Sequence, residues 1–264
     1  MLQRNHGLVS GSFESHVEIG GNPASGLVIL CDHARNVLPP GYGSLGLPAS
    51  EFERHIAYDI GAEAVTLGLS ERLRAPAVLA GFSRLLIDPN RGEDDPTLIM
   101  RLSDGTAVPG NADIDEEERQ RRIEEFYRPY HGAVAGAIGR AVNAGILPAI
   151  LSIHSFTPLW KGVPRPWHAG ILWKSDPRFA RPLLDLLGRE PRLVIGDNEP
   201  YSGGLEGDTL DMHATRRGLP DALIEIRQDL ISEPGGIAEW IDCLARILPA
   251  AIERLHATEG RQHG

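Results

Sequence analysis

Two histidines in this sequence follow short apolar runs. Asp32 and His33 come directly after the run Leu27–Cys31, and His154 closes the run Ala149–His154. Imidazole is a common zinc ligand, and a catalytic zinc needs three protein ligands, usually histidines and a carboxylate, so that one position stays open. The chain has no HExxH motif, which excludes the helix-borne zinc site of many metalloproteases. The two histidines therefore predict a metal site, with zinc as the expected ion, at the ends of two strands.

The third ligand of such a site must supply an oxygen, and three residues compete for this position. Asp59 lies in HIAYDIGA, flanked by apolar helix positions, where an acid needs a partner. Asp32 is adjacent to His33 and can instead orient an imidazole ring. Asn36 stands three residues after His33, but a neutral amide oxygen is a poor zinc ligand. We expect Asp59 to be the ligand and keep Asp32 and Asn36 as alternatives.

A glutamate interrupts the apolar strand pattern ALIEIRQDL. Glu225 is costly to bury unless it is paired or functional. Arg227 lies on the same face under the two-residue period of a strand, so it can neutralise Glu225 or contact a substrate. The functional interpretation makes Glu225 a general base that takes a proton from water and then gives it to a leaving nitrogen.

Candidate substrate contacts come from two further segments. SRLLIDPNR places Arg84, Asn90 and Arg91 around one junction, and guanidinium groups bind carboxylates through two parallel hydrogen bonds. A chain with a net charge of −10 needs such a local cluster of cations to bind an anionic metabolite. Tyr201 and His213 belong to a long glycine-rich segment before the Glu225 strand, and such loops often cover the site of an α/β protein.

The elements that must position these residues alternate along the chain. Several of the apolar runs have the pattern of strands buried on both faces of a sheet. Helices are expected over residues 49–73, opening with a capping box at Ser50 and Glu53, over 113–145, kinked or split at Pro129, and over 234–256. The expected fold is α/β, with a mixed, mainly parallel central sheet sandwiched by helices. The predicted strands are Leu27–Cys31, Ala77–Ala80, Leu85–Asp88, Ala149–His154, Gly170–Trp173, Leu193–Gly196 and Leu223–Arg227.

Composition narrows the class of protein. The 264 residues are 42% hydrophobic and 23% charged, which is typical of a globular chain, and we expect one domain over residues 1–264. The acidic net charge disfavours nucleic acid and anionic membranes as partners. No apolar window is long enough to span a membrane, and a cytoplasmic protein is the default expectation. Cys31 and Cys243 lack CxxC partners and are expected to be buried thiols.

The segments DHARN, SRLLIDPNR, LSIHSF and IEIRQDL, in this order, resemble the N-formylglutamate amidohydrolase family from Leu27 to Ala251. That family is similar in fold to zinc carboxypeptidases and to the aspartoacylase and succinylglutamate desuccinylase enzymes. The resemblance implies a mixed sheet between helices and one zinc ion or other divalent metal per chain. It implies hydrolysis of a small anionic N-acyl amino acid such as N-formylglutamate, in amino-acid metabolism and histidine degradation.

The resemblance also implies roles for individual residues. His33 and His154 match the family's two histidine positions, and Glu225 matches the catalytic glutamate. Asn90 and Arg91 match a pair that holds a substrate carboxylate in the related deacylases.

Two departures from the family pattern keep alternatives open. The commoner PHSG is DHAR in this chain, and the glutamate of an HxxE motif is replaced by Asn36. One alternative is therefore a catalytically inactive binding or regulatory protein on the same scaffold. Another is a deacylase or peptidase for a different acidic amide. The acyl group, the identity of the metal and the oligomeric state stay open at this point.

Overall fold

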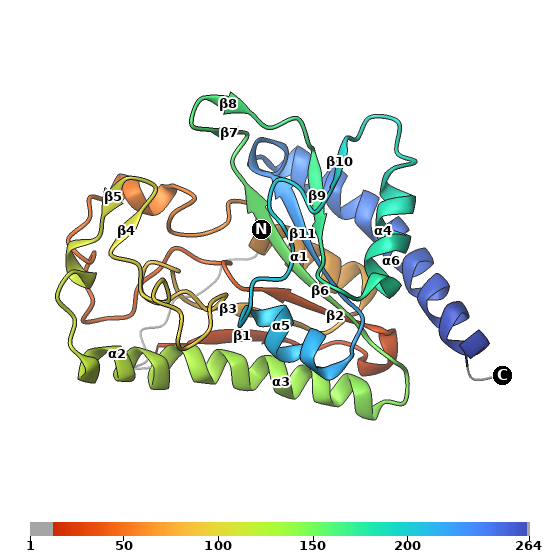
Figure 1. The fold of residues 1–264 in the computed structure, drawn as a ribbon, viewed down its shortest axis with the longest axis horizontal. Helices are drawn as coiled ribbons and strands as arrows, with labels where there is room; N and C mark the ends of the chain where they lie inside the picture. Colours follow the sequence, from red (N-terminus) through yellow and green to blue (C-terminus); the bar gives the residue numbers. More distant parts are fainter. Residues whose placement is uncertain (1–12, 263–264) are drawn as a thin grey trace, which may run out of the picture.

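The computed structural model describes residues 13–262 and, within them, a seven-stranded central sheet (Figure 1). The strand order is β1-β3-β2-β6-β11-β9-β10. The strands are β1 (His16–Ile19), β2 (Leu27–Cys31), β3 (Ala77–Ala80), β6 (Ala149–Phe156), β9 (Ala169–Leu172), β10 (Ile195–Asp197) and β11 (Asp221–Arg227). Two small hairpins pair β4 (Leu102–Ser103) with β5 (Thr106–Ala107) and β7 (Leu159–Trp160) with β8 (Val163–Pro164).

Four neighbouring strands form the parallel centre of this sheet. β3, β2, β6 and β11 all run in one direction. β1 joins β3 in antiparallel orientation, and on the other side β9 is antiparallel to β11 and parallel to β10. The predicted mixed, mainly parallel sheet is thus confirmed. Every residue of β2, β3 and β6 is buried, which explains why their sequences are continuous apolar runs.

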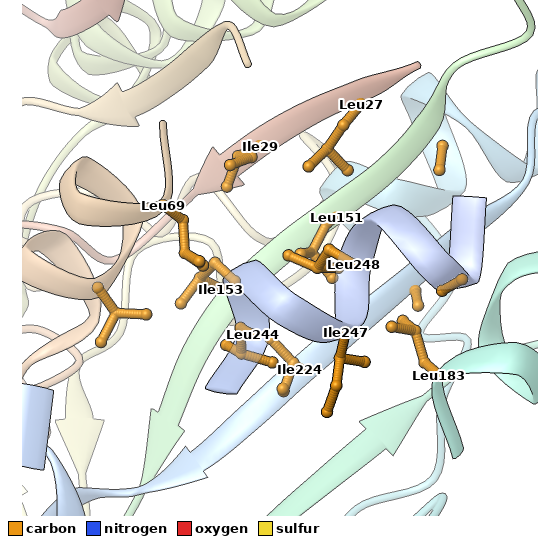
Figure 2. Close-up of a cluster of buried hydrophobic side chains, with 14 of the residues drawn as sticks. Leu27, Ile29, Leu69, Leu151, Ile153, Leu183, Ile224, Leu244, Ile247 and Leu248 are labelled. Atoms are coloured by element: carbon orange, nitrogen blue, oxygen red, sulfur yellow. The ribbon is translucent and has the colours of Figure 1, made fainter. Parts of the chain in front are cut away.

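Helices cover both faces of the sheet and bury alternate residues of each strand. In β2, Leu27 and Ile29 pack with α1 (Ala62–Leu73), α4 (Pro177–Leu187) and α6 (Pro234–Gln262), as Figure 2 shows for this cluster. Val28 and Leu30 point to the opposite face, which α3 (Arg128–Asn143) and α5 (Thr209–His213) cover. Each face thus has its own apolar core. None of the helices in residues 13–262 combines the length and apolarity that a membrane crossing requires.

The predicted strand Leu85–Asp88 is wrong. Leu85 and Leu86 lie in a turn, in which the Leu85 N–H donates to the Ser83 hydroxyl and the Leu86 N–H donates to the Ser83 carbonyl, and Ile87 and Asp88 follow without regular structure. The segment is nevertheless buried, so its apolar character reflects a packed turn. The other six predicted strands are confirmed with ends shifted by up to two residues, and β1 is a strand that sequence analysis missed.

The predicted helix over residues 49–73 is wrong in its first half. Residues Ala49–Glu53 form a short 3₁₀ turn (η2) without a side-chain cap, so the Ser50–Glu53 pair is not a capping box. The α-helix α1 begins only after Gly61, whose φ of 82° is left-handed. A Cβ atom at this glycine would lie 2.2 Å from the Ile231 carbonyl oxygen. Asp59 therefore lies in a loop before α1, not within a helix.

The long helical pattern from residue 113 forms three consecutive segments. α2 (Glu116–Arg122) begins at Asp115, whose side chain accepts a hydrogen bond from the Glu118 N–H. A π-helical turn, Ile123–Tyr127, then leads into α3, where Pro129 occupies the first turn. The expected interruption at Pro129 is thus a π turn just before it, and the segments continue as one long helix in Figure 1. The last predicted helix is confirmed as α6 and extends to Gln262.

Candidate active site

The sheet brings the two predicted histidines to one edge. β2 and β6 are parallel neighbours, so His33, just after β2, lies close to His154 near the end of β6. Glu225 of β11 is the register partner of His154. The loop before α1 returns to this edge, where the Asp59 N–H donates to the His33 carbonyl at 2.9 Å. Residues far apart in sequence thus meet at the carboxyl ends of parallel strands.

Three buried groups converge on one point. His33 Nδ1 lies 3.4 Å from Asp59 Oδ2, and His154 Nδ1 lies 2.8 Å from the same oxygen. The ligand atoms of these three residues all lie within 4.8 Å of one another. Two imidazole nitrogens and one carboxylate oxygen form the donor set of many catalytic zinc sites. The residues therefore fit a divalent metal such as zinc.

The far side of each imidazole ring is held by a second carboxylate. His33 Nε2 lies 2.7 Å from Asp88 Oδ1, and His154 Nε2 lies 3.0 Å from Asp32 Oδ2. An ionised carboxylate only accepts hydrogen bonds, so each Nε2 carries a proton and each Nδ1 is left to bind a proton or a metal ion. Asp32 therefore stands behind His154 and outside the group of ligand atoms.

The alternative ligand Asn36 also lies away from these atoms. Its side-chain amide donates to the Phe52 carbonyl at 2.8 Å. Among the residues that sequence analysis considered for the third ligand, only Asp59 belongs to the converging group.

The electrostatics of the site favour a cation at this point. Burial alone would raise the pKa of Asp59, but His33 and His154 hold it far below its usual range. Burial alone would lower the pKa of His154, but its hydrogen bonds with Asp32 and Asp59 raise it well above the usual range. The carboxylates thus draw positive charge onto His154, and a bound dication would replace a proton there.

Glu225 lies next to these groups, beside His154 in the sheet. Its side chain is buried, and among residues 13–262 nothing bonds its Oε2 atom. Burial raises its pKa to about 7, and the nearby Asp59 acts in the same direction, while His154 opposes the shift. A group of this proton affinity suits a general base at neutral pH.

Arg227 does not neutralise Glu225, contrary to one interpretation of the sequence. Its guanidinium pairs with Asp229 at 2.7 Å and donates to the carbonyls of Arg165 and Trp167. It does not line the cavity at the strand ends, so the structure does not bring this predicted substrate contact to the site.

A cavity of about 400 Å³ opens over these residues. Arg84 lines it, but its guanidinium is engaged with the Asp88 carboxylate at 2.7 Å and lies 3.6 Å from Asp59 Oδ1. This arginine therefore supports the histidine-holding carboxylates. Because Asp88 and Asp59 already compensate the charge of Arg84, this guanidinium is less available to a ligand than the sequence suggested.

Asn90 and Arg91 line the cavity with groups that remain available to a ligand. The Thr209 N–H donates to Asn90 Oδ1 at 3.1 Å, so the NH₂ group of Asn90 is left to donate to a ligand. Arg91 donates to the Asn90 carbonyl through Nη1 and to Thr97 through Nε. The pair thus offers an amide NH₂ and a guanidinium side by side.

The remaining predicted contacts lie at different places. Tyr201 lines the mouth of the cavity, where it is 42% exposed and its ring lies 4.9 Å from the Arg165 guanidinium carbon. His213 lies instead in a neighbouring cavity, where its Nε2 is 2.9 Å from Nδ1 of His131. The structure therefore brings Tyr201 to the site but not His213.

Sequence analysis missed several residues that hold the site together. Asp88 appeared only as the end of a supposed strand, although an acid directly after a buried run was a usable signal. Tyr130 and Thr209 both donate to Asp32. Tyr130 lies on the buried face of α3, and a buried phenol requires a partner, but the sequence does not show which one.

Comparison with known proteins identifies the family to which this sequence is similar. Residues 25–232 match the N-formylglutamate amidohydrolase family. An N-formylglutamate deformylase of Pseudomonas putida is 36% identical over 78 residues, a match that spans 26% of this chain and only 29% of that protein's length.

Two solved structures cover nearly the whole chain. Gene product Atu2144 of Agrobacterium tumefaciens is 35% identical with a TM-score of 0.85, over 92% of this chain and 96% of that one. N-formylglutamate amidohydrolase of Ralstonia eutropha JMP134 is 22% identical with a TM-score of 0.68, over 92% of this chain and 99% of that one, which shows a shared fold. Because the sequence match extends from before β2 to beyond β11 and includes His33, His154 and Glu225, this chain belongs to the N-formylglutamate amidohydrolase family.

Proposed function

We propose that this protein uses a divalent metal, zinc in the first instance, to hydrolyse the amide bond of an N-formyl-type acidic amino acid. The observation that carries the proposal is the buried group of His33, Asp59 and His154 beside Glu225. Family membership supports amide hydrolysis as the reaction. The substrate class also supports a place for this reaction in cytoplasmic amino-acid breakdown, such as that of histidine.

The metal would be held by the two Nδ1 atoms and the Asp59 carboxylate. When bound, such an ion polarises the scissile carbonyl and makes water more acidic. The chain itself contributes the orientation of the ligands. Asp88 and Asp32 fix the rings of His33 and His154 through their Nε2 atoms.

Glu225 would carry the proton of the reaction. Its free Oε2 accepts a proton from water as the water oxygen bonds to the carbonyl carbon. The same carboxyl group then returns this proton to the amide nitrogen as the carbon–nitrogen bond breaks. The products are the free acid, formate for a formyl group, and the free amino acid.

Asn90 and Arg91 would anchor a carboxylate of the substrate. The Asn90 NH₂ group and the Arg91 guanidinium both line the cavity, and charge-assisted hydrogen bonds to a carboxylate are strong and directional. Arg84 adds positive potential, although its own hydrogen bonds go to Asp88. The pocket therefore favours a small anionic N-acyl amino acid.

The inactive binding protein has lost its main support. That alternative rested on Asn36 in place of the HxxE glutamate. The Asn36 amide bonds to the Phe52 carbonyl, and the grouping of Asp59 with His33 and His154 supports Asp59 as the source of the carboxylate oxygen.

The test is hydrolysis by the zinc-reconstituted protein of N-formyl, N-acetyl and N-succinyl derivatives of Glu, Asp and Gln. We expect turnover of the N-formyl acidic amino acids and its loss in the Glu225→Gln variant. The matched control is Asn36→Ala, which should keep its activity if Asn36 only holds the Phe52 loop. Failure of the zinc-loaded wild type to hydrolyse any member of the series would refute the proposed function.

A further inference from the structure

Asp32, the carboxylate behind His154, is held by four hydrogen-bonding groups from three parts of the chain, the helices α3 and α5 and the strand β6. Oδ1 accepts from the Tyr130 hydroxyl at 2.7 Å and the Thr209 hydroxyl at 2.6 Å. Oδ2 accepts from the Ser152 hydroxyl at 2.9 Å and from His154 Nε2 at 3.0 Å. All of these side chains are buried away from bulk solvent.

Thr209 differs from the other donors because it also contacts Asn90, a residue that lines the cavity. Its backbone N–H holds Asn90 Oδ1, as described above. Its hydroxyl lies 2.6 Å from Asp32 and 3.2 Å from the Pro89 carbonyl, and a hydroxyl has a single proton to donate. The shorter contact assigns that proton to Asp32. Thr209, the first residue of α5, therefore connects two parts of the site. Its hydroxyl supports His154 through Asp32, and its backbone N–H supports Asn90.

We infer that Thr209 is a positioning residue whose hydroxyl sets the metal affinity of the site through Asp32 and His154. The inference rests on the proposed function only in taking His154 as a metal ligand. Oδ1 of Asp32 depends on Thr209 and Tyr130 alone for its hydrogen bonds among the described residues. When one donor is lost, the carboxylate is less firmly fixed and holds the His154 ring less well.

Two replacements at this position separate the hydroxyl from the shape of the side chain. Thr209→Val keeps the shape and removes the hydroxyl, whereas Thr209→Ser keeps the hydroxyl. Both keep the backbone N–H that holds Asn90, so KM for an N-acyl amino acid should stay close to the wild-type value in the zinc-saturated enzyme. The matched control is Thr66→Val, at a buried threonine of α1 whose hydroxyl, among the described residues, makes no hydrogen bond to Asp32, His154 or Asn90.

The measurement is the dissociation constant for zinc, from competition with a chromophoric chelator in the absence of substrate. We expect Thr209→Val to bind zinc ten- to a hundredfold more weakly than wild type, the usual effect of losing an outer-shell partner. Thr209→Ser and Thr66→Val should bind it like wild type. If the Val chain does not fold, Tyr130→Phe removes the other donor to the same oxygen and carries the same expectation.

Three outcomes would overturn the inference. Wild-type affinity in a folded Thr209→Val protein would show that the hydroxyl does not matter, and a Ser variant as weak as the Val variant would assign the effect to side-chain shape. A wild-type chain that binds no divalent metal would overturn this inference and the proposed metal together. Normal zinc binding without hydrolysis of any substrate would refute only the proposed function.

Discussion

Glu225→Gln should make the enzyme slower and the metal-free protein more stable at alkaline pH. The carboxylate is buried, and among residues 13–262 its Oε2 has no hydrogen-bond partner, so ionising it costs free energy in the folded chain. In the proposed mechanism, the ionised form accepts a proton from water. Glutamine has nearly the same shape but cannot take up the proton.

The size of both effects follows from the site. Loss of a general base lowers kcat by about 10²–10⁴ with little change in KM. For stability, burial raises the pKa of Glu225 from 4.5 to about 7. At about 1.4 kcal/mol for each tenfold change in proton affinity, ionised Glu225 costs the folded state on the order of 3 kcal/mol.

The pH window follows from the direction of the shift. Below pH 4 the folded and unfolded chains both hold the proton, so Glu225 contributes no pH-dependent difference. Between about pH 4.5 and 7 the folded chain holds more protons, and wild-type stability therefore falls as pH rises. The Glu225→Gln variant does not lose stability in this way as pH rises, because glutamine does not ionise. A metal ion beside the carboxylate would stabilise its ionised form, so the stability comparison requires the metal-free protein.

The assay is urea unfolding of both proteins in a chelator at pH 4.5 and pH 8, with kcat measured separately on the zinc-loaded forms. The stability advantage of Gln over Glu should grow between the two pH values by up to about 3 kcal/mol. Taking the difference between pH values removes any constant cost of burying the amide. A pH-independent stability difference would refute the buried-ionisation argument, and an unchanged kcat would refute the role of Glu225 as the base.

Further predictions concern the metal and the anchor. His33→Ala and His154→Ala should abolish retention of stoichiometric zinc, measured by plasma emission, while circular dichroism shows a folded chain; full occupancy in either variant would remove that residue from the ligand set. Asp59→Ala should also lose zinc, whereas Asn36→Ala should not. Arg91→Ala should mainly raise KM, with kcat/KM lower by about ten- to a hundredfold, and Arg91→Lys should rescue it only partly. A fall in kcat alone would contradict the anchoring role. Chelation should abolish hydrolysis, and added zinc should restore it.

The strands and the principal site residues were predictable because their signals are local. A strand buried on both faces must be apolar throughout, so polar residues at its end stand out, as His33 and His154 do. Glu225 was detectable for a similar reason, since an acid within an apolar strand requires a partner or a function. The order of strands in the sheet then places all three at one edge.

The errors arose where a long-range contact decides the local structure. The helix predicted from residue 49 does not form before α1. Gly61 interrupts it because this glycine packs against the Ile231 carbonyl, a contact between residues far apart in sequence. The residues 85–87 are apolar because they are buried in the core, and periodicity alone does not distinguish a buried turn from a short strand. Arg84 lines the cavity as expected, but the sequence does not show that its guanidinium also bonds to Asp88.

The charges of the site explain why Arg84 and Arg91 take different roles. The acids around the two histidines are Asp32, Asp59, Asp88 and Glu225. With Glu225 ionised as a base, a dication and Arg84 together leave one negative charge uncompensated, and Arg91 at the rim of this group balances it. Without the dication, the raised pKa of His154 keeps a proton on this ring between Asp32 and Asp59, and the raised pKa of Glu225, about 7, favours its neutral form in acid, so protons compensate part of the negative charge. A bound dication would take the place of these protons, and Arg91 is the arginine whose charge remains available to a substrate carboxylate.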